Sequence, residues 1–203
     1  MGEIVLNFFE KLTDNSELIT LLTAMFPLIE LKGAIPIGTG LGLNLIKSAV
    51  LAYVGSSIIV IPIFFLLIPI FNLLKKIKFI KKIVEKIEKV FDEKAQEVSK
   101  NAGGNEDSKT KFLMLALFIF VSVPFPVTGV WTGTAIAVFL NMKFSNAFLP
   151  IILGNLIAGT IITIITFFFQ AYVDLIISIL LIIAIIMLVI FIVKVIKSKP
   201  KTE

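Results

Sequence analysis

Two long apolar blocks constrain the fold of this chain more than any other feature. Residues 18–74 contain three charged side chains and residues 112–193 contain two. The whole chain is 58% hydrophobic and 16% charged, whereas a soluble domain is about 45–50% apolar and 25% charged. A domain of 203 residues cannot bury that much apolar surface in its own interior. We therefore predict an all-α integral membrane protein.

The residue types that are missing exclude most enzyme chemistries. The chain has no Cys and no His, and all 19 basic residues are Lys. Disulfides, thiolate or imidazole metal sites and a histidine general base are thus excluded. Lys47 and Ser48 are the one nucleophile–base pair on offer, but adjacent residues diverge on a helix. We expect no enzyme, no metal and no cofactor.

Three segments are long enough to span a bilayer as helices, at 1.5 Å per residue. They are residues 49–74, 147–169 and 175–193. Between the apolar blocks, residues 75–91 repeat Ile and Val at i, i+3, i+4 spacing with Lys on the other face. That pattern predicts an amphipathic helix on an anionic membrane surface and not a nucleic-acid arm. Residues 92–111 are polar and glycine-containing, which favours a linker.

Two further apolar helices are too short to span. Residues 18–29 and 112–123 would each be about 18 Å long and run into segments rich in Gly, Pro and Thr, at 30–40 and 124–133. We predict two re-entrant hairpins, because irregular backbone at membrane depth must be buried in protein or line a cavity. A kinked spanning helix is the alternative in each case. The expected tip residues are Gly33, Pro36, Gly38 and Gly40 in the first hairpin, and Pro124, Pro126, Gly129 and Gly133 in the second.

The two apolar blocks resemble each other as an internal repeat. Each has a short helix, a tip, a Leu-Asn step (Leu43-Asn44 and Leu140-Asn141) and a long helix with a central glycine. Pro36 precedes Gly55 by 19 residues, however, whereas Pro126 precedes Gly154 by 28. We expect Pro36 and Pro126 to mark two apices that meet near the membrane midplane.

Charge sets the expected topology. Residues 1–17 carry a net charge of −3, residues 75–111 carry +4 and the tail carries +3. By the positive-inside rule the N-terminus lies outside the plasma membrane and the C-terminus in the cytoplasm, so the two hairpins enter from opposite faces. We expect one multi-pass membrane domain with about three spanning helices. Its segments are an external segment 1–17, repeat one 18–74, a cytoplasmic segment 75–111, repeat two 112–170, and a spanning helix with a basic tail 171–203.

Glu30 and Lys32 are the charges that need an explanation. Charged side chains at membrane depth cost a few kcal/mol each and mark function by default. At i, i+2 spacing on a helix the two side chains point apart, so each is expected to find another partner. Glu30 is expected to exchange a proton. Both residues alternatively lie at the interface and reach water.

Polar side chains accompany the second tip. Thr128, Trp131 and Thr132, with Thr134 nearby, are expected to line a substrate site, or else to serve as small packing residues with an interfacial tryptophan. Asn155 lies in the middle of a spanning helix. It is a candidate for the same site, although such an asparagine more often bonds to a neighbouring helix.

The motif Glu30-Leu-Lys-Gly-Ala-Ile-Pro36, followed by Pro124-x-Pro-x-Thr-Gly-x-Trp-Thr-Gly133, resembles the small multidrug export protein family, which is related to the DedA or VTT superfamily. The resemblance implies opposed re-entrant hairpins and movement of lipids between leaflets, including polyprenyl-phosphate carriers, often with proton coupling. It also implies that an acidic and a basic hairpin residue matter. Here these are Glu30 and Lys32, and relatives of the wider superfamily usually carry Arg at the position of Lys32.

We therefore expect a transporter or lipid translocase that binds a lipid-phosphate or other small-molecule substrate between the hairpin tips. An exporter of small cationic or amphipathic compounds is the alternative within transport, and a non-transporting membrane scaffold is the alternative outside it. The expected partners are membrane lipids and not nucleic acid. A homodimer is left open.

Overall fold

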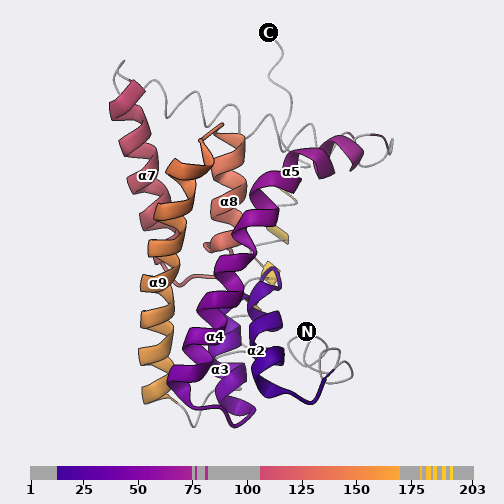
Figure 1. Cartoon of the computed structure of the whole chain (residues 1–203), viewed down its shortest axis with the longest axis vertical. Coiled ribbons are helices and arrows are strands. Elements are labelled where there is room, and N and C mark those ends of the chain that lie inside the picture. Colours follow the sequence, from indigo (N-terminus) through magenta and orange to yellow (C-terminus); the bar gives the residue numbers. More distant parts are fainter. Residues whose placement is uncertain are drawn as a thin grey trace.

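The computed structural model describes residues 13–74, 76, 81 and 106–169, with scattered positions between 179 and 193. These described residues contain helices and no strand, which confirms the all-α prediction for this part of the chain (Figure 1). The helices are α2 (Ser16–Met25), α3 (Glu30–Gly40), α4 (Leu45–Ile58), α5 (Val60–Leu74), α7 (Glu106–Ser122), α8 (Val130–Phe139) and α9 (Phe144–Phe168).

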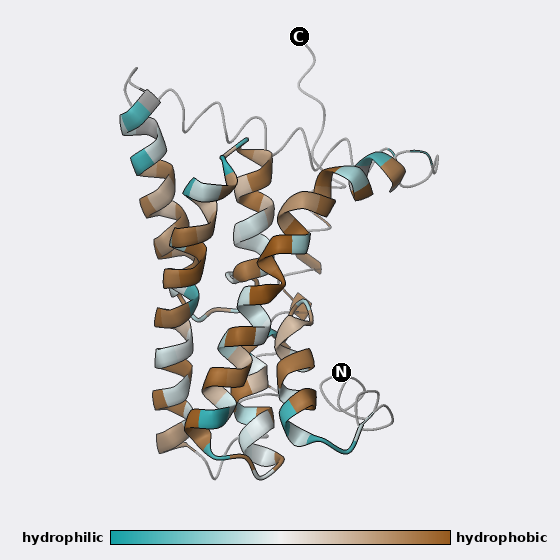
Figure 2. Cartoon of the chain, viewed as in Figure 1, coloured by the Kyte–Doolittle hydropathy of each residue, from teal (hydrophilic) through white to brown (hydrophobic). Residues whose placement is uncertain are grey.

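Two helical stretches are long and apolar enough to cross a membrane. One is Leu45–Ile70, which joins α4 to α5, and the other is α9. Both coincide with predicted spanning segments. Figure 2 shows hydrophobic residues along most of α5 and α9, and hydrophilic ones where α7 begins. Large apolar side chains, such as Phe65 and Phe168, are more than half exposed, and a surface of this kind needs an apolar partner such as lipid.

Several predicted segments lie outside the described residues. The spanning helix at 175–193 and the surface helix at 75–91 are described at isolated positions alone, and residues 1–12 not at all. The predicted linker at 92–111 needs one correction, because α7 already begins at Glu106.

Two helix–loop–helix units meet near the centre of the molecule. In the first, residues 26–29 connect α2 to α3, and in the second, residues 123–129 connect α7 to α8. Figure 1 shows the two units extending from opposite ends of the molecule, so that their loops meet near its middle. This arrangement is the one expected for opposed hairpins.

The first loop lies elsewhere than the sequence indicated. Residues 30–40 form helix α3, with Pro36 inside it, so the expectation that this segment is irregular is wrong. Gly33, Pro36, Gly38 and Gly40 are therefore helical and not at an apex. Proline removes one N–H from a helix, but membrane helices tolerate this loss when neighbouring groups satisfy the freed carbonyl. The apex proline of the first hairpin is Pro27.

In the second hairpin the loop is placed as predicted at 124–129, but the prediction is wrong for residues 130–133, which belong to α8. Pro124, Pro126 and Gly129 lie between α7 and α8, and Gly133 falls within α8. Pro126 and Pro36 are thus not a pair of apices. The residue that corresponds to Pro126 is Pro27.

The local backbone recurs with an offset of 99 residues. Leu28 and Val127, which follow the two apex prolines, both have φ 73°. Gly42 and Asn141 both have positive φ, at 85° and 53°. The same offset relates the ends of α3 and α8 and the beginnings of α4 and α9. The distance from Pro27 to Gly55 is 28 residues, the same as from Pro126 to Gly154. The mismatch in the predicted repeat arose because Pro36 was taken as the apex.

The central glycines let helices approach closely. A Cβ on Gly55 would lie 2.3 Å from the Leu21 carbonyl oxygen, and one on Gly154 would lie 2.8 Å from the Phe118 carbonyl oxygen. α4 therefore packs against α2 as α9 packs against α7. Leu21 and Phe118 are 97 residues apart, so the offset between α2 and α7 is 97. The second loop, residues 123–129, is three residues longer than the first, residues 26–29, and two of the extra residues precede the apex proline.

Candidate functional site at the meeting of the loops

Glu30 and Lys32 form a buried ion pair. Their exposed fractions are 6% and 5%, and Lys32 Nζ lies 3.0 Å from Glu30 Oε2. The prediction that they point apart is wrong. It assumed ordinary helical geometry at both positions, but Glu30 has φ 49°, in the left-handed region. At the first residue of α3 this turns its side chain toward Lys32. A left-handed non-glycine residue is uncommon and carries strain.

The carboxylate of Glu30 also binds the start of α8. Its Oε1 accepts a hydrogen bond from the backbone N–H of Trp131 at 3.1 Å. This N–H belongs to the first turn of the helix, where four backbone donors have no partner within the helix. Gly129, the residue before α8, makes room for the carboxylate, because a Cβ there would lie 1.6 Å from Glu30 Oε2.

Two further hydrogen bonds join the loops. Lys32 Nζ donates to the carbonyl oxygen of Thr128 at 3.1 Å. The indole Nε1 of Trp131 donates to the carbonyl oxygen of Met25, the last residue of α2, at 3.1 Å. Each hairpin therefore satisfies backbone groups at a helix end or loop of the other, and Trp131 joins the two hairpins through both its backbone N–H and its indole N–H.

The threonines take part less than expected. The Thr128 hydroxyl lies within hydrogen-bond distance of the carbonyl oxygens of Val123 and Phe125, at 2.7 and 2.9 Å, and its single O–H is shared between them. This residue therefore meets Lys32 through its backbone carbonyl. The Thr134 hydroxyl donates to Val130 within its own helix. Thr132 is partly buried on α8. A role of these side chains in binding substrate stays a prediction.

Asn155 binds a neighbouring helix. Its Nδ2 donates to Ser56 Oγ at 2.8 Å and to Ser57 Oγ at 3.3 Å, which links α9 to the end of α4. The structure thus does not bring Asn155 into the Glu30–Lys32 group. Ser56 and Asn155 are themselves 99 residues apart, so the two repeats also touch at this equivalent pair.

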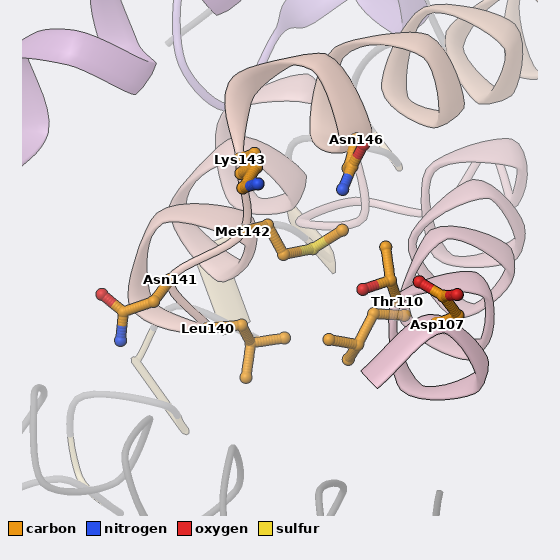
Figure 3. Close-up of a pocket in the computed structure, with 8 residues that line it drawn as sticks. Asp107, Thr110, Leu140, Asn141, Met142, Lys143 and Asn146 are labelled. Carbon is orange, nitrogen blue, oxygen red and sulfur yellow. The ribbon is translucent and has the colours of Figure 1, made fainter. Parts of the chain in front are cut away.

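A separate cavity of about 330 Å³ lies at the end of the molecule where α7 begins. Figure 3 shows polar side chains at this cavity, among them Asp107, Asn141 and Lys143. Leu113, Leu140 and Met142 also line it. None of the residues that line this cavity belongs to the group around Glu30 and Lys32. The cavity and the place where the two loops meet are therefore distinct.

Sequence reasoning missed two parts of the site. The role of Gly129 as the space for a carboxylate depends on a residue 99 positions away. The first apex had a visible signal, since Phe26-Pro27-Leu28 and Phe125-Pro126-Val127 are similar tripeptides. Within the described residues, no group of three or more acidic side chains is placed to hold a metal ion.

A comparison with known families bears on this arrangement. Residues 30–161 match the family described as "Putative small multi-drug export protein". The chain belongs to this family. The matched region begins at Glu30 and includes α3 and α8, the two helices that begin where the loops meet. No curated protein and no solved structure matches the chain. The family and the long apolar helices together point to a membrane transporter and not to an enzyme.

Proposed function

We propose that this protein is a membrane transporter that binds the anionic headgroup of an amphiphile where its two loops meet. The observation that carries the proposal is the position of the Glu30 carboxylate. It lies against the first turn of α8 and beside the Lys32 ammonium, which is where an anion binds at a helix N-terminus. Glu30 is in effect an internal ligand of an anion site.

Displacement of Glu30 leaves a set of hydrogen-bond donors. The Lys32 ammonium and the Trp131 N–H would then face the space that Glu30 Oε1 and Oε2 occupy. Those donors fit a phosphate-type headgroup, although Lys offers a point charge and not the bidentate fork of Arg. Protonation of Glu30 removes its negative charge and weakens both contacts, so uptake of a proton would favour its exchange for the substrate. This links substrate binding to a proton gradient.

The arrangement of the hairpins supports the transport step. The recurrence of the backbone at an offset of 99 residues, with the two units entering from opposite ends, is the layout of transporters with inverted repeats. We propose that both hairpins are re-entrant and that the family is related to the DedA or VTT superfamily. In this scheme the N-terminus is external, the C-terminus is cytoplasmic and the site lies near the midplane of the plasma membrane.

Export of small cationic or amphipathic compounds is the second candidate, and the description of the family as a small multi-drug export protein favours export of drug-like compounds in general. In that scheme Glu30 is the counter-charge of the substrate. Its carboxylate already accepts from Lys32 and Trp131, however, so a cation has to compete with both. The geometry favours the anionic substrate for this reason.

Binding measured with purified protein distinguishes the two. Trp131 is the sole tryptophan and lies in the site, so its fluorescence reports occupancy directly. We expect a polyprenyl phosphate in mixed micelles to change this signal, and Lys32→Met to weaken its binding about tenfold or more, since a hydrogen bond to a charged group contributes about 1.5–3 kcal/mol. Lys47→Met, which removes a half-exposed ion pair with Glu17, is the matched control and should bind normally.

A lipophilic cation provides the opposing arm. If the cation changes the signal while the phosphate does not, and Lys32→Met leaves cation binding intact, the anionic proposal is wrong. Flux into proteoliposomes then separates either transporter from a scaffold.

A further inference from the structure

The core of the first hairpin contains hydroxyl groups that packing alone does not explain. Thr20 and Thr23 on α2 and Ser48 on α4 are each 0% exposed. Within the part of the chain that the structure describes, the hydroxyls of Thr23 and Ser48 have no hydrogen-bond partner. The great majority of buried hydroxyl groups in proteins form a hydrogen bond, either with another protein group or with an ordered water molecule. These two therefore indicate a ligand that donates and accepts hydrogen bonds.

The hydroxyls of Thr20 and Ser48 face each other across Gly38. Thr20 Oγ1 and Ser48 Oγ lie 2.7 and 2.9 Å from the position that a Cβ on Gly38 would take, so they are no farther apart than the sum of these distances. They are not hydrogen-bonded to each other. Two oxygens at this separation are within reach of a single bridging water molecule. Because Gly38 has no side chain, no methyl group of α3 separates the two hydroxyls, although the Thr20 Cγ2 methyl also lies 2.8 Å from the same position.

The same positions in the second hairpin are apolar. By the offsets of 97 and 99 residues, Thr20 corresponds to Leu117, Gly38 to Ala137 and Ser48 to Ala147. These three residues belong to one buried hydrophobic cluster. The repeat thus supplies its own comparison, since one backbone arrangement has a dry core in one unit and a hydroxyl-lined core in the other.

The hydroxyls follow one face of α2 from its start toward the loops. Ser16, Thr20 and Thr23 are spaced i, i+4, i+7, which places them on one side of the helix over about 10 Å. The Thr20 hydroxyl donates to the backbone carbonyl oxygen of Ser16, and the Ser16 hydroxyl donates to the carbonyl oxygen of Leu41, so both can still accept a hydrogen bond from water. Thr23 lies two residues before Met25, whose carbonyl binds Trp131 at the site.

We propose that Ser16, Thr20, Thr23 and Ser48 form a water-binding seam in the first hairpin, which leads water from the open end of that hairpin toward the Glu30–Lys32 pair. The charged groups on the helices that bound the seam are Glu17 and Lys47 at its open end, which pair with each other, and Glu30 and Lys32 at the loops. The seam itself is uncharged. Water along it supplies a one-sided route for protons, because the equivalent core of the second hairpin is apolar. The seam rests on the proposed function in one respect, because the proposed function identifies the Glu30–Lys32 pair as the end of this proton route.

Cysteine accessibility tests the seam without any transport measurement. The chain contains no Cys, so Ser48→Cys introduces a single thiol, and Ala147→Cys is the matched control at the equivalent position, also 0% exposed. We expect a small water-soluble methanethiosulfonate reagent to modify Ser48→Cys at least about tenfold faster, because a thiol needs water to form the reactive thiolate. Both variants should react equally once unfolded. Equal rates in the folded protein, or slower reaction of Ser48→Cys, overturn the proposal.

Thermal stability gives a second measurement that does not need the cysteine variants. If the Thr23 hydroxyl is dry and unpaired, Thr23→Val removes a buried unsatisfied group and raises the melting temperature. If water binds to the Thr23 hydroxyl, the same change removes its hydrogen bonds to water and leaves the melting temperature unchanged or lowers it. We expect this second outcome. Thr134→Val is the control, since that hydroxyl is equally buried but bonds within its own helix. A rise for Thr23→Val above that of the control refutes a hydrated seam, even where headgroup binding at the loops is confirmed.

Discussion

Gly129→Ala is the most direct test of how the two hairpins hold each other. The new Cβ would lie 1.6 Å from Glu30 Oε2 and 2.3 Å from its Cδ, so the carboxylate has to move. Gly129 itself has φ −138°, which alanine adopts without strain. The whole cost of the substitution therefore comes from the displaced carboxylate.

The magnitude follows from the contacts that are lost. Displacement breaks the hydrogen bond from Trp131 N–H and the ion pair with Lys32. Each hydrogen bond to a charged group contributes about 1.5–3 kcal/mol, and separating a buried pair costs about 3–5 kcal/mol. Because these terms overlap, we expect Gly129→Ala to lower the free energy of unfolding by about 3–5 kcal/mol. Gly40→Ala is the control. Nothing lies within 4 Å of its added Cβ, so its effect should stay within about 1 kcal/mol.

The assay is reversible unfolding in mixed micelles, followed by Trp131 fluorescence. A second background decides the mechanism. In Glu30→Ala/Lys32→Met the carboxylate and its partner are both gone, so the added methyl group meets no carboxylate and Gly129→Ala should cost less than about 1 kcal/mol. If Gly129→Ala costs the same in both backgrounds, its effect comes from the loop backbone. The conclusion that Gly129 makes room for the Glu30 carboxylate is then wrong.

Three further predictions follow from the contacts. Trp131→Phe removes the indole donor to α2 and should lower the free energy of unfolding by about 1–3 kcal/mol, measured by circular dichroism because the variant has no tryptophan. A double-mutant cycle of Asn155→Leu and Ser56→Ala should give a coupling energy of about 0.6 kcal/mol, and no coupling would mean that α9 and α4 are held by packing alone. In intact cells, Asn15→Cys should react with an impermeant thiol reagent and Asn141→Cys should not. Both side chains are exposed, at the open ends of the opposed hairpins, so the reverse pattern would invert the proposed topology.

Composition and segment length predicted the helical segments of the described residues. The apolar segments at 49–74 and 147–169 form long helices, and the short segments at 18–29 and 112–123 coincide with the first arms of two helix–loop–helix units. These features depend on local hydrophobicity and on reach, and both can be read from a single chain. The second loop, with Pro124 and Pro126, was placed for the same reason.

The first loop was misplaced because two prolines compete for the role. Pro36 lies between Gly33 and Gly38 and looks like a helix break, yet it lies within α3. Pro27 has the same context as Pro126, with Phe before it and a branched apolar residue after it. The deciding information was the repeat register, and the choice of Pro36 concealed that register. The similarity between the two tripeptides was therefore a better guide to the first apex than the helix-breaking tendency of a single proline.

The error at Glu30 has a different origin and changes how the residue is understood. Periodicity assigns an orientation only inside a regular helix, and Glu30 has left-handed backbone torsions at a helix boundary. Its contacts also come from residues about 100 positions away, which no local pattern reports. A structural role, as the cap of α8, and a functional role, as a group that leaves when substrate binds, seemed to be alternatives for this residue. In the proposed function the two roles combine, because the carboxylate that stabilises the contact between the two loops occupies the donors that an anionic headgroup would need. Removal of Glu30 should then both destabilise the junction and strengthen binding of an anion, whereas a residue with only a structural role would weaken both.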